Sequence, residues 1–196
     1  MAHQRGVSLI ELIVGMTIVA ILLVMGVPTF SLWIQNTQNR TAAESIQNGL
    51  QLARVEAIRR NANVRFNLSD ATGLVTWDVG CVTVTQDCPS NIQRKIAIDG
   101  TVNARVGISR SAPPAAVPAN QYSTAIAAGT GLAAGVTFGG TGRIPTTQIG
   151  TDITRIDITN AVASTSRRLV VIIGAGGQIR MCDPALALSA NPQGCS

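Results

Sequence analysis

The sequence holds little with which an enzyme site is built. Its 196 residues include a single histidine, His3, and only 13% of them are charged. Without a histidine in the body of the chain, the serines have no imidazole base, which excludes Ser-His catalysis. The glycines at 174–177 are not followed by Gly-Lys-Ser/Thr, so no phosphate-binding loop is predicted. We therefore expect neither enzyme activity nor a cofactor.

Aromatic residues are also scarce, at 3% of the chain, whereas apolar residues reach 46%. The core of a folded domain must then be built from Val, Ile, Leu and Ala. The 19 glycines and the low charge content suit a short-stranded, turn-rich extracellular domain better than a cytosolic enzyme. The net charge of +5 permits an anionic partner without requiring one.

What the sequence does have is a long apolar run near its start. From Val7 to Val27 only Ser8, Glu11 and Thr17 carry polar side chains. As a helix this run spans roughly 32 Å, about the hydrocarbon thickness of a bilayer, so it can cross a membrane. An ionised Glu11 inside it costs on the order of 2.5–3.5 kcal/mol, which marks this carboxylate as a functional candidate that needs a partner.

The six residues before the run have no apolar region of their own. A secretory signal is cut after its apolar region, whereas here the plausible processing point, Gly6, precedes it. Cleavage there removes His3 and leaves a free α-amine at Val7, four residues ahead of Glu11. That amine on a neighbouring copy of the chain is a natural partner for the carboxylate.

The stretch Gly6-Val7-Ser8-Leu9-Ile10-Glu11-Leu12 resembles the class III signal sequence of type IV pilins and type II secretion pseudopilins. The resemblance implies that a prepilin peptidase cuts after Gly6 and that the amine of Val7 is methylated. It also implies that Glu11 contacts the N-terminus of an adjacent subunit in a filament, and that Pro28 kinks the helix. The alternative is a plain membrane anchor, in which Glu11 only favours the positive start of the helix.

This resemblance divides the chain into a leader, 1–6, a transmembrane half-helix, 7–28, an amphipathic half-helix, 29–62, and a β-rich head, 63–196. It implies a single-pass protein of the bacterial inner membrane with a periplasmic head, which later joins a pilus fibre at the cell surface. Its partners would be the major pilin and other minor pilins.

The second half of the helix is predicted from one apolar stripe of Ala43, Ile46, Leu50, Ala53 and Ala57, with an end near Arg60. Residues 52–61 resemble the helix end of the GspH/FimT branch of minor pilins and pseudopilins. The period then changes to two, and the consecutive short strands predict an antiparallel sheet packed on the helix, an α+β fold. The expected strands cover residues 64–68, 74–79, 81–85, 153–158, 167–173 and 178–182, with a hairpin of 93–98 and 101–109 around Asp99-Gly100. Residues 136–144 resume the sheet and resemble a strand-turn element of the same branch.

Residues 111–135 break this pattern. They hold three of the eight prolines, carry no charge and include Tyr122 as their one aromatic residue. We expect a surface loop or a weakly ordered insertion there.

The four cysteines, Cys81, Cys88, Cys182 and Cys195, allow three pairings. A chain exported to an oxidising periplasm is expected to form disulfides, and we predict the two local pairs, Cys81–Cys88 and Cys182–Cys195. The second would pin the tail at the end of the head furthest from the membrane in the family's usual arrangement. No Cys-x-x-Cys spacing is present, so no metal site is expected.

Three functions are open. One is a structural minor pilin that primes pilus assembly at or near the tip, and another is a minor pseudopilin of type II secretion. The remaining one is a DNA-binding minor pilin, because Gly177-Gln178-Ile179-Arg180 resembles a Gly-Arg-x-Arg pattern of such relatives, with Gln178 in place of the first Arg. A basic patch would consist of Arg143, Arg167, Arg168 and Arg180. Four ordinary solvated arginines are the favoured alternative.

Overall fold

The structure, a computed structural model, describes residues 8–111, 118 and 120–196, and for residues 25–28 it describes the backbone alone. By compactness the chain divides into residues 1–34 and a head of residues 35–196. One helix, α1 (Leu9–Arg60), contributes its first part to the former and the rest to the latter. The expected leader, with the cleavage residues Gly6 and Val7, lies outside the described residues.

The helix continues through Pro28, where the proline removes one backbone donor without ending it. The kink expected there stays a prediction. The expected end near Arg60 is confirmed, and its cause is local. Asn61 has a positive φ of 46°, its N–H donates to Ile58 O over 3.2 Å, and the N–H of Ala62 donates to Ala57 O over 3.1 Å. This pair of bonds is the Schellman arrangement, which satisfies the last carbonyls of the helix.

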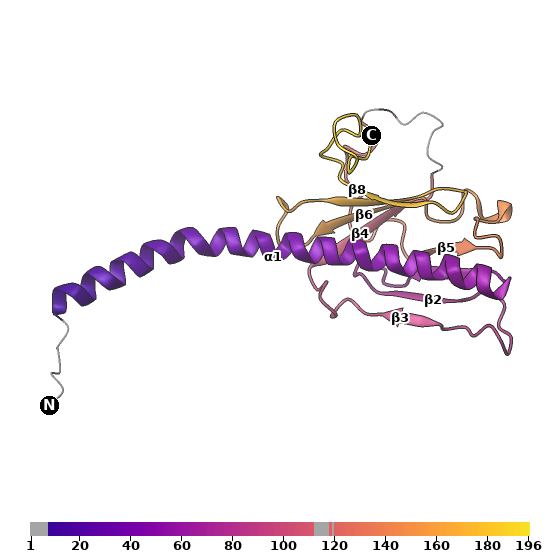
Figure 1. Cartoon of the computed structure of the whole chain (residues 1–196), viewed down its shortest axis with the longest axis horizontal. Coiled ribbons are helices and arrows are strands. Elements are labelled where there is room, and N and C mark those ends of the chain that lie inside the picture. The colour runs from indigo at the N-terminus through magenta and orange to yellow at the C-terminus, as the bar shows by residue number, and fades with distance from the viewer. Residues whose placement is uncertain (1–7, 112–117, 119) are drawn as a thin grey trace. The chain divides into compact units, whose positions relative to one another are not determined.

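In the described part of the head, eight strands form two four-stranded antiparallel sheets (Figure 1). Sheet 1 has the order β3-β2-β1-β5 and sheet 2 the order β4-β6-β7-β8. A short 3₁₀ helix, η1 (Thr146–Gln148), precedes β6. The strands are β1 (Val64–Leu68), β2 (Trp77–Cys81), β3 (Gln93–Lys95), β4 (Ala104–Ser109), β5 (Ala134–Phe138), β6 (Arg155–Asn160), β7 (Leu169–Ile173) and β8 (Ile179–Cys182).

The head part of α1 runs along both sheets and shares one apolar core with them (Figure 1). The predicted helical stripe, Ala43 to Ala57, is fully buried. Its small residues let the sheets approach closely: a Cβ on Gly49 would lie 2.8 Å from the ring of Phe66. From sheet 1, Phe66 and Trp77 pack as a tilted pair with centroids 5.6 Å apart, and the Trp77 indole N–H donates to Ser45. An α+β head built around this helix is therefore confirmed.

Two strand predictions were wrong. Residues 82–85 do not continue β2, because the Cys81–Cys88 disulfide turns the chain there, and Cys81 N–H donates to Pro89 O. Residues 93–109 do not form a hairpin either. A turn with Gly100 at φ 84° is present, but it carries the chain from β3, paired with β2, to β4, paired with β6 in the other sheet. Pairing with β6 turns Val106 and Ile108 into the core, and this long-range gain outweighs the local hairpin signal.

The expected loop at 111–135 is also corrected. Ala134 and Gly135 already belong to β5, paired with Leu68 and Asn67. Residues 120–133, which we call the strap, cross the outer face of sheet 2 and reach the edge of β4. There Gly129 N–H donates to Val106 O over 2.9 Å and Ile108 N–H to Thr130 O over 2.9 Å. The strap is thus an ordered layer of the head. The rest of the expected insertion, residues 112–117 and 119, lies outside the described residues.

Candidate functional site

The first part of α1 presents an apolar surface on every side. Its large apolar side chains from Leu9 to Val24 are each 50–77% exposed. It is the one described helix that is long and apolar enough to cross a membrane. Glu11 lies in its first turn and is exposed, with no ion pair among the described residues. Such a surface needs lipid or other apolar helices around it.

One side of this segment is hollowed into a shallow apolar groove. Gly15 lies in it, and a Cβ at that position would meet no atom within 4 Å. Because small residues allow close approach between helices, the groove is suited to a side chain of a neighbouring helix. It is lined by Leu12, Gly15, Met16, Val19, Ala20 and Leu23.

The four arginines of the expected basic patch do not form a cluster of free charges. Arg167 pairs with Asp183, and Arg168 pairs with Asp157 at 2.5 Å. Arg180 donates to two tail carbonyls, Gly194 O at 3.1 Å and Cys195 O at 2.8 Å, which hold its guanidinium without neutralising it. Arg143 is exposed, with no side-chain bond among the described residues.

These arginines are also spread along the sheet. Arg167 and Arg168 precede β7, whereas Arg180 lies opposite Ile172 near the other end of that strand. Arg143 lies one residue before Ile144, whose N–H donates to Ala175 in the β7–β8 turn. Arg167 and Arg168 are neighbours in sequence, but their side chains pair with different carboxylates, and Arg143 and Arg180 are separate positive charges.

A dense polar cluster surrounds Asp157, on the outer face of β6. Alternation along β6 turns Ile156 and Ile158 into the core and Arg155 and Asp157 outward. Asp157 is nevertheless fully buried, because the strap covers it. Its carboxylate accepts from Arg155 at 2.6 and 2.9 Å, from Arg168 at 2.5 Å and from the Ile126 N–H at 3.0 Å. We call Asp157, Arg155 and Arg168 the carboxylate clamp.

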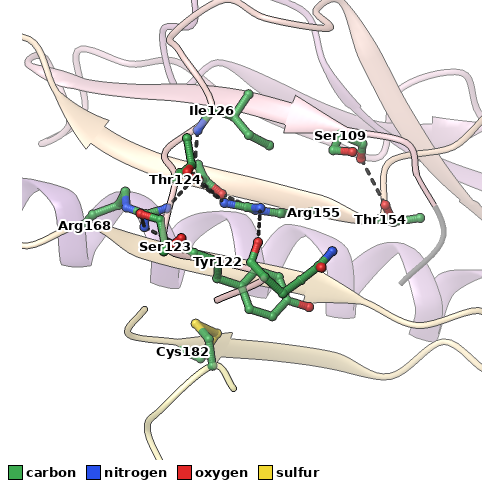
Figure 2. Close-up of polar contacts among 12 residues, drawn as sticks. Ser109, Tyr122, Ser123, Thr124, Ile126, Thr154, Arg155, Arg168 and Cys182 are labelled. Carbon is green, nitrogen blue, oxygen red and sulfur yellow. Dashed lines mark hydrogen bonds and ion pairs between the residues drawn. A yellow bond between two sulfur atoms is a disulfide. The ribbon is translucent and has the colours of Figure 1, made fainter. Parts of the chain in front are cut away.

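The two arginines of the clamp hold the strap by its backbone (Figure 2). Arg155 donates to Gln121 O at 3.1 Å and to Thr124 O at 2.8 Å. Arg168 donates to Ser123 O at 3.0 Å and also to Tyr122 O. Four successive carbonyls are thus bound by two cations that one carboxylate orients. Such charge-assisted bonds are stronger than neutral ones.

Close approach of the backbones completes this contact. On β4, Gly107 faces the strap, and a Cβ there would lie 2.3 Å from Ala127 O. Any larger residue at this position would push the strap off the sheet.

Tyr122 links the strap to the C-terminal tail. It is buried in a second, smaller apolar cluster with Val170, Cys182 and Cys195, and Arg155 lies over its ring at 5.0 Å from the centroid. Figure 2 shows the Tyr122 ring beside Cys182. The structure pairs the cysteines locally, Cys81 with Cys88 and Cys182 with Cys195, at Cα separations of 5.6 and 5.0 Å. The second disulfide therefore supports the strap as well as the tail.

The position expected for the tail was wrong. Asp183, next to Cys182, pairs with Arg167, whose backbone N–H donates to Asn36 at 2.7 Å. Asn36 lies two residues after Ile34, so the disulfide-linked tail lies beside the first residues of the head's helix, not at the end where Arg60 lies. The cause is strand direction, because β8 starts beside Ile173 and runs back toward Val170.

Two carboxylates of the head have a pKa below the ordinary range. Burial raises the pKa of Glu56, but hydrogen bonds and charge from Arg59 and Arg60 outweigh it and lower the value. The Thr72 hydroxyl, at 2.5 Å, is the main cause of the lowered pKa of Asp70, helped by the Thr72 and Leu74 amides and the charge of Arg105 against the opposing effect of burial. Both groups hold chain ends or turns in place. Among the described residues no group of His, Cys, Asp and Glu is arranged to hold a metal ion.

Sequence reasoning missed the clamp residues Arg155 and Asp157 and the role of Tyr122. The alternation at 153–158 marked Arg155 and Asp157 as outward-facing, which on an ordinary sheet means solvated. The available signal was the lone Tyr122 within an apolar, uncharged insertion, because such a ring needs an apolar surface to cover.

Comparison with known families gives two matches. The model of the family described as type II transport protein GspH matches residues 42–177. The model of the prokaryotic N-terminal methylation motif matches residues 1–27. No curated protein matches the chain.

Among solved structures, the type IV minor pilin FimU of Pseudomonas aeruginosa is similar at 16% identity and a TM-score of 0.47, covering 80% of this chain and 94% of FimU. The minor pseudopilin EpsH of the type 2 secretion system of Vibrio cholerae is similar at 12% identity and a TM-score of 0.48, covering 76% of this chain and 99% of EpsH.

Proposed function

The chain belongs to the GspH family of minor pilins and pseudopilins, and from this premise we propose that it is incorporated in a type IV pilus and primes assembly at or near the tip. The observation that carries the proposal is the N-terminal segment. It combines a methylation motif at 1–27 with a helix whose apolar side chains are exposed on all sides and a carboxylate in its first turn. In water such a helix would leave a large apolar surface exposed, whereas a subunit that moves from a membrane into a bundle of helices keeps that surface covered.

In this proposal the chain starts as a single-pass protein of the inner membrane, with the head in the periplasm. Prepilin peptidase cuts after Gly6, and the amine of Val7 is methylated. Glu11 then pairs with the amine of an adjacent subunit, which offsets the cost of holding the carboxylate among apolar helices. The groove around Gly15 receives a side chain of a neighbouring helix, and Pro28 bends the helix.

Glu11 provides the test, because insertion and assembly make different demands on it. Glu11→Ala and Glu11→Gln should both insert in the membrane as well as wild type, since removing the charge removes a cost. Both should be largely lost from sheared pili, whereas Glu11→Asp should be incorporated in part. The matched control is Thr17→Val, a polar-to-apolar change in the same segment, which should be incorporated normally. Normal incorporation of Glu11→Gln would falsify the pairing.

Processing is tested separately with Gly6→Val. The variant should accumulate in the membrane fraction at the mass of the full chain. A mature product of unchanged mass, measured by mass spectrometry, would remove the cleavage assignment while leaving the membrane segment in place.

A minor pseudopilin of type II secretion is the second candidate, favoured by the family model that covers 42–177. It would use the same processing and the same Glu11 contact, so the head does not separate the two. Deletion of the gene does: loss of surface pili with normal secretion supports the pilus, and loss of secretion with normal pili supports the secretion system.

DNA binding is a weaker alternative. Arg167 pairs with Asp183, and Arg168 shares Asp157 with Arg155 and is further held by strap carbonyls. Arg143 and Arg180 are the two expected arginines with no carboxylate partner among the described residues. Two phosphate contacts support only weak, salt-sensitive binding. A gel shift at low salt tests it: we expect no shift for wild type and a weak one for Gln178→Arg. A clear wild-type shift that Arg180→Gln removes would favour DNA uptake.

A further inference from the structure

The composition of the membrane segment leaves its depth in the bilayer open. Between Glu11 and Arg40 no residue is charged, a stretch of 28 residues from Leu12 to Asn39. As a helix this stretch is about 42 Å long, whereas the hydrocarbon core of a bilayer is about 30 Å thick. The helix could therefore slide by about 12 Å, roughly eight residues, before a charge entered the core.

Two aromatic residues, Phe30 and Trp33, lie just after the end of the apolar run, where they can fix the depth of the helix. Phe30 and Trp33 are two of only six aromatic residues in the chain, and both are 62% exposed. They stack on one face of α1 with ring centroids 5.8 Å apart. The other described aromatic side chains, such as Trp77 and Tyr122, are buried in the head.

Their position fits the boundary of the membrane. Phe30 and Trp33 follow Val27, the end of the apolar run, by three and six residues, or about 4.5 and 9 Å along the helix. The headgroup layer of one leaflet extends about 5–7 Å beyond the hydrocarbon. Side chains on a helix point back toward its N-terminus, so the Trp33 ring lies closer to the membrane than its Cα does.

We infer that Phe30 and Trp33 are a lipid-interface anchor, which binds phospholipid headgroups on the head side of the bilayer and fixes the depth of the helix. Amphipathic aromatic rings are favoured at this level, because the ring body is apolar and the indole N–H finds polar partners. The polar run from Gln35 to Asn39 then starts directly outside the headgroups. This inference rests on the proposed membrane insertion and adds the depth at which the helix lies in the bilayer.

Trp33 is its own depth probe. The full chain is reconstituted in phosphatidylcholine vesicles that carry bromine at different depths of the acyl chain, and tryptophan quenching is measured. We expect Trp33 at about 15–22 Å from the bilayer centre, the level of the headgroups. Trp77 should add no depth-dependent quenching, because it is 3% exposed in the core of the head. In Trp33→Phe the depth-dependent part should therefore vanish.

A second probe tests whether the aromatics set the register. Ile18→Trp, in the Trp33→Phe background, places a tryptophan near the middle of the apolar run, and quenching should locate it near the bilayer centre. A further variant carries Ile18→Trp with Phe30→Ser and Trp33→Ser, so that both aromatic rings are absent. In this variant the tryptophan at position 18 should lie at a different depth or over a broader range of depths. Leu32→Ser, which removes apolar surface from the same turn without removing a ring, is the matched control and should leave the depth unchanged.

The outcomes separate the anchor from the proposed function. Flotation of the vesicles measures insertion: a chain that does not float overturns both. A chain that floats with Ile18→Trp quenched near the centre, but with Trp33 unquenched or as deep as Ile18→Trp, overturns the anchor and leaves insertion standing. Quenching of Trp33 that falls as the chain concentration in the vesicles rises, with unchanged flotation, means that a neighbouring helix covers the pair, and this also overturns the anchor.

Discussion

The two faces of sheet 2 are held by different chemistry. On the inner face, Ile156, Ile158 and Val171 pack against α1 in the main core. On the outer face of the same strands, the carboxylate clamp and the Tyr122 cluster hold the strap and the tail. The inner contact is apolar, continuous and shared with sheet 1. The outer contact consists of a few directed bonds around one buried carboxylate and one disulfide.

This difference implies two levels of stability within the head. Apolar burial is non-directional and is lost only when the whole core opens. The part of the strap that covers Asp157, residues 121–126, can in contrast leave the outer face without exposing the core, because the other side of each strand remains packed. Among the described residues of the strap, only its end, at Leu132, packs against the main core. We therefore expect the outer layer to open before the rest of the head, as segments with few buried apolar contacts do.

The largest effect is expected in the core. Phe66→Ala removes a fully buried ring that packs against Gly49 and Trp77, and should lower the free energy of unfolding by about 3–5 kcal/mol. Denaturant titration of the full chain in detergent measures this. Val55→Ala, at a 58% exposed position of the same helix, is the control and should change stability by less than about 0.5 kcal/mol.

The second effect is that of the outer disulfide. Replacing both Cys182 and Cys195 by Ala removes a loop constraint that contributes about 2–3 kcal/mol in the chain-entropy picture, together with the surface on which Tyr122 packs. Limited proteolysis should cut the strap and tail while the core remains intact. The Cys81–Cys88 pair closes a shorter loop, with a sequence separation of 7 instead of 13, on the other sheet, so Cys81→Ala/Cys88→Ala should leave the strap resistant. Equal cleavage of the strap in both variants would contradict the link between tail and strap.

The inner, apolar contacts of the head were easier to predict from the sequence than the outer contacts of the strap. The helical stripe and β1 were predictable, because each depends on a local period that one buried face imposes. The pairing of β4 with β6 was not, since a turn at Gly100 looks the same whether its two strands pair with each other or with distant partners. Nor was the clamp, because Arg155, Asp157, Arg168 and Tyr122 are brought together only after sheet 2 has formed. Outward-facing charge on a strand reads as solvated until something is known to cover it.

The third prediction isolates the clamp itself. Asp157→Asn keeps the size of the side chain but removes the charge that orients Arg155 and Arg168, and should cost about 1.5–3 kcal/mol of strap docking, the range for hydrogen bonds to charged groups. Hydrogen exchange gives a direct reading, because the Ile126 N–H donates to this carboxylate. Its protection should fall, while amides of β1 should keep theirs. Glu44→Gln, which breaks the exposed pair with Arg40, should change neither. Loss of β1 protection in Asp157→Asn would mean that the two layers unfold as one.

The smallest effect tests whether charge or location makes the outer layer weaker. Glu56 is a charged contact on α1 itself, where it pairs with Arg59 and Arg60 at 2.7 Å each and lies next to the core residue Ala57. Its pKa is lowered in the folded head, so above its ordinary value of 4.5 the carboxylate is charged in both states and its contribution is complete. As the pH falls through the lowered pKa, the folded chain must also take up the proton, and this contribution is lost.

Because the arginines are partly exposed, the loss should be up to about 1 kcal/mol. Comparing the pH dependence of unfolding with that of Glu56→Gln measures it. We expect the whole head to be affected equally, since Glu56 holds the end of the helix on which both sheets pack. If acid instead unfolded only the region around Arg60, a charged contact would open locally even on the helix that carries the core. The low stability of the outer layer would then follow from its charged contacts and not from its position on the outer face.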